Sequence, residues 1–163
     1  MLLGVVGDTH NRLSNVEKII DIFNEKNVDK VIHTGDITQA KTLDRFSRLN
    51  CSLIGVYGNN DLEEKGLKDI AKQKGFNFQN PPFLLKISNK KIGIFHEPDE
   101  IEMIIDKYPS LDLILHGHTH RYRNELVNGV NVFNPGECAG SQEGKNAIGL
   151  VNLDNLMVKR IFF

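Results

Sequence analysis

The sequence has 163 residues, of which 40% are hydrophobic and 25% charged, a globular composition that excludes a disordered or fibrous chain. Its formal net charge of -1 favours neither a nucleic-acid binder nor a membrane-surface binder. No apolar run reaches the roughly 18 residues that a bilayer requires, and Cys51 and Cys138 are expected to be free thiols in a reducing compartment. We therefore expect one cytoplasmic domain spanning residues 1–163.

The first half of the chain alternates predicted strands and helices. Leu2–Gly7 is a short apolar run that ends at a polar loop, as a buried parallel strand does. Asn15–Asn27 has apolar residues at helical spacing, and Ser14 with Glu17 predicts its N-terminal cap. The alternation continues with a strand at Lys30–His33, a helix at Leu43–Leu49, a strand at Ser52–Tyr57 and a helix at Leu62–Lys74 that Gly75 ends.

Hairpin signals dominate the second half. The strongest is Asn128-Gly129, which lies between the apolar segments Leu126–Val127 and Val130–Phe133. One sheet packed on another with helices outside fits this order. The other predicted elements are a hairpin of Phe83–Ile87 and Lys91–Phe95, a helix at Glu100–Lys107, a strand at Leu111–Leu115, and a hairpin of Ala147–Leu153 and Met157–Phe163.

Metal-binding residue types follow the predicted strands, each at the point where a strand ends. In open α/β sheets, ligands bind at this carboxyl edge. The residues are Asp8, His10, Asp36, Asn59, His96, His118 and His120.

These seven side chains offer nitrogen and oxygen donors without a thiolate, which suits manganese, iron, nickel or zinc rather than a structural zinc site. Seven donors exceed the needs of one ion and predict two, with the carboxylate of Asp36 as the natural bridge. Two cations roughly 3.5–4 Å apart polarise a phosphoryl group and lower the pKa of a bound water from 15.7 to about 7, which generates a bridging hydroxide for in-line attack at phosphorus.

The ends of the predicted strands carry five motifs in a fixed order: Gly7-Asp8-Thr9-His10, Gly35-Asp36, Gly58-Asn59-Asn60-Asp61, His96 and Gly117-His118-Thr119-His120. These ordered motifs resemble those of the calcineurin-like metallophosphoesterase superfamily. The short length and Asn134-Pro135-Gly136 resemble its small prokaryotic YfcE-like phosphodiesterase branch. The resemblance covers Leu2 to about Leu153.

The resemblance implies a four-layer α/β/β/α sandwich and a metal-dependent phosphoric diester hydrolase. Its cofactors would be two divalent transition-metal ions, manganese first, with nickel, iron or zinc as alternatives. Its partner would be a small phosphodiester, with no membrane and no nucleic acid beyond nucleotides; a homo-oligomer is compatible with the sequence. Asp8, His10 and His120 would hold the first metal, Asn59, His96 and His118 the second, and Asp36 would bridge them.

Two positions depart from the family pattern. Many relatives have a histidine where this chain has Asn60, and that histidine is thought to stabilise the phosphate or protonate the leaving group. The Asn60 amide can donate a hydrogen bond to a phosphate but cannot deliver a proton, so we expect faster turnover with aryl than with alkyl leaving groups. Glu97 stands where relatives commonly have glycine, and its carboxylate either repels an anionic substrate or faces away.

Several alternatives stay open. A non-catalytic scaffold resembling the retromer subunit of this fold is the main one, and phosphomonoesterase and nuclease activities are the others. His33 and His116 are interpreted as packing residues or as partners that orient a ligand. Arg12 is either a phosphate-binding residue or a solvated side chain.

Overall fold

Two mixed β-sheets form the centre of the fold in this computed structural model, which describes residues 1–142 and 144–163. The first sheet has the order β11-β10-β1-β2-β3-β4, in which β1 to β4 are parallel, β10 pairs antiparallel with β1, and β11 pairs antiparallel with β10. Its strands are β1 (Leu2–Val6), β2 (Lys30–His33), β3 (Ser52–Val56), β4 (Asn77–Gln79), β10 (Ala147–Asn152) and β11 (Met157–Phe162).

The second sheet has the order β5-β6-β7-β9-β8. Its three inner strands are parallel to one another, while β5 and β8 pair antiparallel at the two edges. Its strands are β5 (Phe83–Ile87), β6 (Lys90–Ile94), β7 (Leu113–Leu115), β8 (Arg123–Val127) and β9 (Val130–Asn134).

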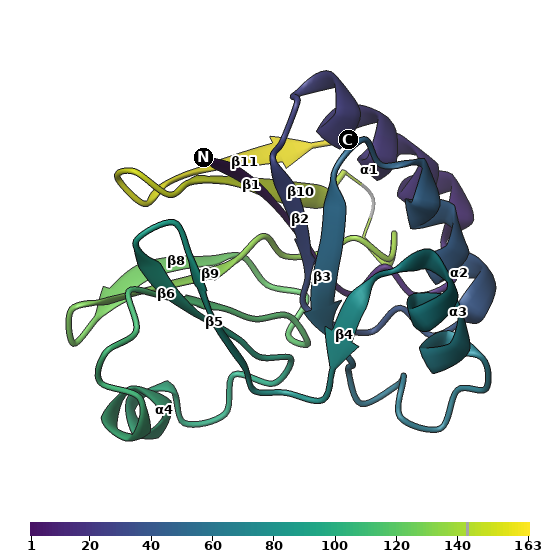
Figure 1. The fold of residues 1–163 in the computed structure, drawn as a ribbon. Helices are drawn as coiled ribbons and strands as arrows, with labels where there is room; N and C mark the ends of the chain where they lie inside the picture. The colour runs from purple at the N-terminus through teal and green to yellow at the C-terminus, as the bar shows by residue number, and fades with distance from the viewer. Residues whose placement is uncertain (143) are drawn as a thin grey trace.

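Helices cover the outer face of each sheet, so the molecule has four layers (Figure 1). The helices α1, α2 and α3 lie against the first sheet, and α4 lies against the second. This arrangement confirms the predicted α/β/β/α sandwich. The helices are α1 (Leu13–Glu25), α2 (Ala40–Arg45), which continues as a 3₁₀ turn (Phe46–Arg48), α3 (Leu67–Lys74) and α4 (Ile101–Lys107).

Alternation of side chains along the strands divides the core into three clusters. On β1, Leu3 and Val5 join the cluster between the sheets, whereas Val6 joins the cluster under the first three helices. On β7, Leu113 joins the cluster between the sheets, and its neighbour Ile114 packs with α4. Successive strand residues face opposite sides of a sheet, so continuous apolar runs are what strands covered on both faces require.

The helix starts are the main corrections to the predicted elements. The Arg12 carbonyl already accepts the backbone N–H groups of Asn15 and Val16, at 2.9 and 3.1 Å, so α1 begins at Leu13 and the predicted Ser14 cap is wrong. The predicted helix at Leu62–Lys74 begins only at Leu67, after Gly66, whose φ of 85° is left-handed.

Two further differences concern short elements. Strand β4 was not predicted, because its three residues are mostly polar and exposed and carry no periodic apolar signal. The second predicted helix, Leu43–Leu49, is instead α2 at Ala40–Arg45 followed by the 3₁₀ turn. Within the described ranges, no helix is long and apolar enough to cross a membrane.

Candidate metal centre

The seven side chains predicted as metal ligands lie on five loops at the carboxyl ends of β1, β2, β3, β6 and β7. The loops of the two sheets meet where the parallel strands end, so residues 110 positions apart in the sequence are in contact, as in the 2.9 Å hydrogen bond from the His118 backbone to Asp8 Oδ1. The residues brought together are Asp8, His10, Asp36, Asn59, His96, His118 and His120.

One group of donors consists of Asp8, His10 and His120, each of which offers an atom within 4.8 Å of the other two. The two imidazole rings lie 5.5 Å apart. His120 Nε2 is 3.9 Å from Asp8 Oδ1, and His10 Nε2 is 3.8 Å from Asp36 Oδ2. These separations are the scale on which side chains surround one ion.

A second group lies on the other side of Asp36. His96 Nε2 is 2.9 Å from Asn59 Oδ1, and His118 Nδ1 is 3.1 Å from the same oxygen. His96 Nε2 is also 3.4 Å from Asp36 Oδ1. One carboxylate oxygen of Asp36 thus faces each group, which is the geometry that a bridging ligand needs.

Hydrogen bonding shows that this cluster suits a cation. His96 Nδ1 is 2.8 Å from the Thr34 carbonyl; a carbonyl only accepts, so this nitrogen carries the proton and a neutral ring presents a lone pair at Nε2. That lone pair faces the oxygens of Asn59 and Asp36, which are acceptors too. Among the described residues, the buried Asp8 Oδ2 also has no hydrogen-bond partner. Facing lone pairs and an unsatisfied carboxylate oxygen are costly when buried. A proton on His96 Nε2 relieves the first in the protein without metal, since burial opposes this proton but the nearby Asp36 raises the pKa of His96; divalent cations would satisfy both.

The carboxylates of the cluster differ in their electrostatics. Burial raises the pKa of Asp8, and the nearby His96 and His120 offset this only in part. Burial alone would also raise the pKa of Asp36, but in the protein without metal a protonated His96, which donates to Asp36 and adds positive charge, and the hydrogen bonds from Asn60 hold that pKa well below its usual range. Asp36 is therefore a carboxylate at neutral pH, as a bridging ligand must be.

Left-handed backbone conformations gather at these loops. A positive φ is uncommon for a residue other than glycine, and such conformations persist only where surrounding contacts hold them. Here the backbone N–H of Asp8 donates to the Gly35 carbonyl and that of His10 to the Asp36 carbonyl, both at 2.9 Å. The ligand candidates with positive φ are Asp8, His10, Asp36, His118 and His120.

Glu137 is a residue to which the sequence analysis assigned no role. It is 2% exposed, and its Oε2 lies 2.6 Å from His120 Nδ1. Because the carboxylate accepts a hydrogen bond from the proton-bearing Nδ1, the other ring nitrogen, Nε2, keeps a lone pair that can bind a metal. Carboxylates commonly orient metal-binding histidines in this way. Its place directly after Asn134-Pro135-Gly136 was the one signal in the sequence that could have identified it.

Asp61 was part of a motif in the sequence analysis but was given no role there. Its Oδ1 accepts the backbone N–H groups of Ile37 and Thr38, at 2.8 and 2.7 Å, and its Oδ2 accepts that of Gly58 at 2.8 Å. It thereby joins the loop after β2 to the loop after β3. The acidic residue acts as a clamp between the loops that carry Asp36 and Asn59.

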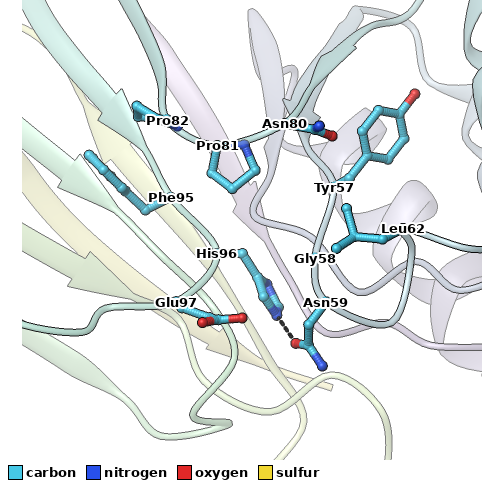
Figure 2. A pocket seen from close by; sticks show the side chains of 10 residues that line it. All are labelled: Tyr57, Gly58, Asn59, Leu62, Asn80, Pro81, Pro82, Phe95, His96 and Glu97. Carbon is cyan, nitrogen blue, oxygen red and sulfur yellow. Dashed lines mark hydrogen bonds between the residues drawn. The ribbon is translucent and has the colours of Figure 1, made fainter.

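Asn60 contacts Asp36 twice. Its backbone N–H donates to Oδ1 at 3.0 Å and its side-chain amide to Oδ2 at 2.7 Å. The amide that was predicted to reach a substrate phosphate is therefore engaged with the carboxylate in this structure. Glu97 lines a cavity beside His96 rather than facing away (Figure 2).

The two remaining histidines are buried next to the cluster. His33 Nδ1 accepts the Gly35 backbone N–H at 3.1 Å, so its Nε2 carries the proton and donates to Thr9 Oγ1 at 3.1 Å. Burial lowers the pKa of His33 to about 3 and that of His116 to about 4. Both rings are neutral at pH 7. Arg12 Nε donates to the Ala139 carbonyl at 3.0 Å, so this nitrogen is engaged within the protein.

Known proteins resemble this chain along its whole length. The calcineurin-like phosphoesterase superfamily domain matches residues 1–156. Phosphodiesterase MJ0936 of Methanocaldococcus jannaschii is 36% identical over 167 residues, which cover 99% of this chain and 98% of the relative. A solved structure described as a novel archaeal phosphodiesterase has a TM-score of 0.91 at 35% identity and covers 100% of both chains.

More distant structures share the fold. The phosphoesterase Yfce of E. coli has a TM-score of 0.71 at 18% identity, over 99% of this chain and 98% of its own. Vps29 of Entamoeba histolytica, solved in complex with zinc, has a TM-score of 0.71 at 21% identity over 99% of each chain. The family match and the full-length relative agree with the order of motifs and with the position of the polar cluster, and the chain therefore belongs to the calcineurin-like phosphoesterase superfamily.

Proposed function

We propose that this protein is a binuclear metal-dependent phosphodiesterase. The observation that carries the proposal is the convergence of nitrogen and oxygen lone pairs on both sides of Asp36, with no thiolate among them. The similarity to a protein named a phosphodiesterase, over nearly the full length of both chains, supports hydrolysis of a phosphoric diester.

The side chains divide the work between two cation positions. Asp8, His10 and His120 would hold the first cation, and Glu137 would keep His120 turned so that Nε2 faces it. The hydrogen bond to the Thr34 carbonyl would keep His96 in the tautomer that binds through Nε2. The ligands of the second cation would be Asn59, His96 and His118, with Asp36 as the bridge.

When bound, two divalent cations supply the positive charge that polarises a phosphoryl group and lowers the pKa of a water from 15.7 to about 7, so that hydroxide can attack phosphorus in line. The two hydrogen bonds from Asn60 hold the Asp36 carboxylate in place between the two groups. An amide cannot protonate a leaving oxygen at neutral pH. Diesters with good leaving groups are therefore the expected substrates.

Manganese is the proposed metal, because the mixed imidazole, carboxylate and amide set suits first-row divalent ions without selecting a soft one. Nickel, iron and zinc are the alternatives that a metal series would distinguish. A small phosphodiester is the proposed substrate, since a near-zero net charge does not provide the basic groove that long nucleic acids require.

The test is hydrolysis of bis(p-nitrophenyl) phosphate by the metal-loaded protein. We expect activity that depends on added manganese, and its loss in Asp36→Asn and in His120→Ala. Asp21→Asn is the matched control, because Asp21 lies on the exposed surface of α1. Activity retained in both site variants would contradict the proposed metal centre, and equal activity on p-nitrophenyl phosphate would contradict the assignment to diester chemistry.

A scaffold function like that of the retromer subunit is the second candidate. The fold shared with Vps29 favours it. Because that Vps29 structure holds zinc, metal content does not separate the two candidates unless hydrolysis is measured beside it. Fewer than one ion per chain after manganese loading, together with no diester hydrolysis, would support the scaffold.

A further inference from the structure

A cavity of about 410 Å³ opens directly beside the second group of donors (Figure 2). His96 and Asn59, which are in contact through a 2.9 Å interaction, form part of its wall. Its volume falls within the roughly 300–1,000 Å³ that small-molecule sites occupy. An ester group attached to a phosphate held at His96 and Asn59 would reach into it.

The other walls of the cavity are mainly apolar. Pro81 and Pro82, in the connection between the two sheets, lie across the opening from Leu62 (Figure 2). Phe95, just after β6, also lines the cavity, although its ring turns away from Leu62 and packs under α4. Leu62 is 58% exposed although it stands next to a polar reaction centre. An exposed apolar side chain that adjoins further apolar surface in a concave site commonly marks a place where a ligand is bound.

The charge of the cavity restricts what can occupy it. Glu97 supplies a carboxylate, and among the described residues that line the cavity there is neither lysine nor arginine. A second phosphate or a carboxylate would be repelled there and would find no cation to pair with. A flat, uncharged ring would contact the proline rings and Leu62 at no electrostatic cost.

We infer that this cavity, the ester pocket, holds the ester group that stays on phosphorus, that this group is uncharged and aromatic, and that the phosphate lies at His96 and Asn59. The inference rests on the proposed phosphodiesterase function and names the substrate class: diesters in which the ester group that stays on phosphorus is aromatic and carries no further phosphate. The ring can come from an aryl ester or from a nucleobase.

Three diesters that release the same leaving group separate binding in the pocket from chemical reactivity. They are bis(p-nitrophenyl) phosphate, the p-nitrophenyl ester of thymidine monophosphate, and methyl p-nitrophenyl phosphate. We expect kcat/KM for at least one of the two aromatic diesters to exceed that of the methyl diester by about tenfold or more, the scale of discrimination by apolar pockets. The aromatic diester that is preferred identifies the source of the ring.

The variant Leu62→Asp places a charge at the pocket wall and should reduce this ratio of kcat/KM values about tenfold. Leu126→Asp is the matched control, since Leu126 is 67% exposed on β8 and does not line the pocket. The variant Glu97→Gln should raise kcat/KM for a diester whose ring bears a carboxylate, relative to the unsubstituted phenyl diester. A ratio near one in the unmodified protein, or a ratio that Leu62→Asp leaves unchanged, would overturn the inference.

A binding measurement keeps the pocket testable apart from catalysis. Saturation-transfer NMR with diphenyl phosphate should show transfer to the rings, which Leu62→Asp removes and Leu126→Asp retains, whereas dimethyl phosphate should show none. If no diester is hydrolysed, the proposed function fails, and ring transfer still reports on the pocket. If hydrolysis occurs without ring transfer or an aromatic preference, only the pocket inference fails.

Discussion

Replacing Glu137 should weaken metal binding without touching a metal ligand. The buried Glu137 carboxylate accepts a hydrogen bond from His120 Nδ1 at 2.6 Å. Burial raises the pKa of Glu137, but the hydrogen bonds from His120 and Ser141 outweigh it, so this pKa lies below its usual value. Hydrogen bonds to charged groups contribute about 1.5–3 kcal/mol, and about 1.4 kcal/mol corresponds to tenfold. Losing this bond in Glu137→Ala should therefore lower manganese affinity about 10- to 100-fold, the scale found for partners of ligating histidines.

Calorimetric titration of the metal-free protein with manganese measures the effect. Glu137→Gln, which keeps an acceptor of nearly the same shape, should lose less affinity than Glu137→Ala. Glu125→Gln is the control, because Glu125 is an exposed residue of β8. Equal manganese affinity in Glu137→Ala and the unmodified protein, with the fold intact by circular dichroism, would refute the role of Glu137 in orienting His120.

Three further predictions address other parts of the site. Asn60→His supplies a group that can protonate a leaving oxygen, so the dependence of kcat on leaving-group pKa across a series of diesters should become shallower; an unchanged slope would contradict this. Burial lowers the pKa of His33 from 6.5 to about 3, so below about pH 6.5 only the unfolded state takes up this proton, and stability falls as the pH drops towards 3. Urea denaturation with a chelator present measures the free energy of unfolding at each pH, and its fall with decreasing pH should be less steep in His33→Gln than in the unmodified protein, by up to about 1.4 kcal/mol per pH unit. Equal slopes in the two proteins would exclude the effect. A Cβ at Gly58 would collide with the Asp36 carboxylate and lie 2.8 Å from His96 Cε1, so Gly58→Ala should cost about 100-fold in kcat/KM. Gly75→Ala is the control, because an added Cβ there has nothing within 4 Å and only the left-handed φ of 70° is strained. This variant should lose stability but keep its kcat/KM, and similar kcat/KM values for the two glycine variants would count against the crowding argument.

Much of the fold was predictable because its strands are covered on both faces. Apolar runs such as that of β1 identified strands, and the Asn128-Gly129 turn identified the hairpin of β8 and β9. The start of α3 was misplaced because residues 62 to 65 are helix-compatible types, whereas the helix begins only after Gly66, which adopts a left-handed φ of 85°. Strand β4 forms because it pairs with β3, and pairing with a distant segment leaves no periodic signal within three residues.

The site was predictable where residue type and strand position coincided. Asp36 and His96 follow apolar strands, so their convergence could be inferred from the sequence alone. The roles of Glu137 and Asp61 were missed because a buried carboxylate that binds a histidine or backbone N–H groups resembles an ordinary turn residue in the sequence. The engagement of Asn60 with Asp36 rather than with solvent depends on a side-chain rotamer, which spacing does not encode.

The most direct test of the central claim is anomalous diffraction from manganese-loaded crystals. The account predicts two peaks roughly 3.5–4 Å apart, one among Asp8, His10 and His120 and one among Asn59, His96 and His118, with a carboxylate oxygen of Asp36 contacting each. A single peak, or peaks away from these side chains at saturating manganese, would contradict it.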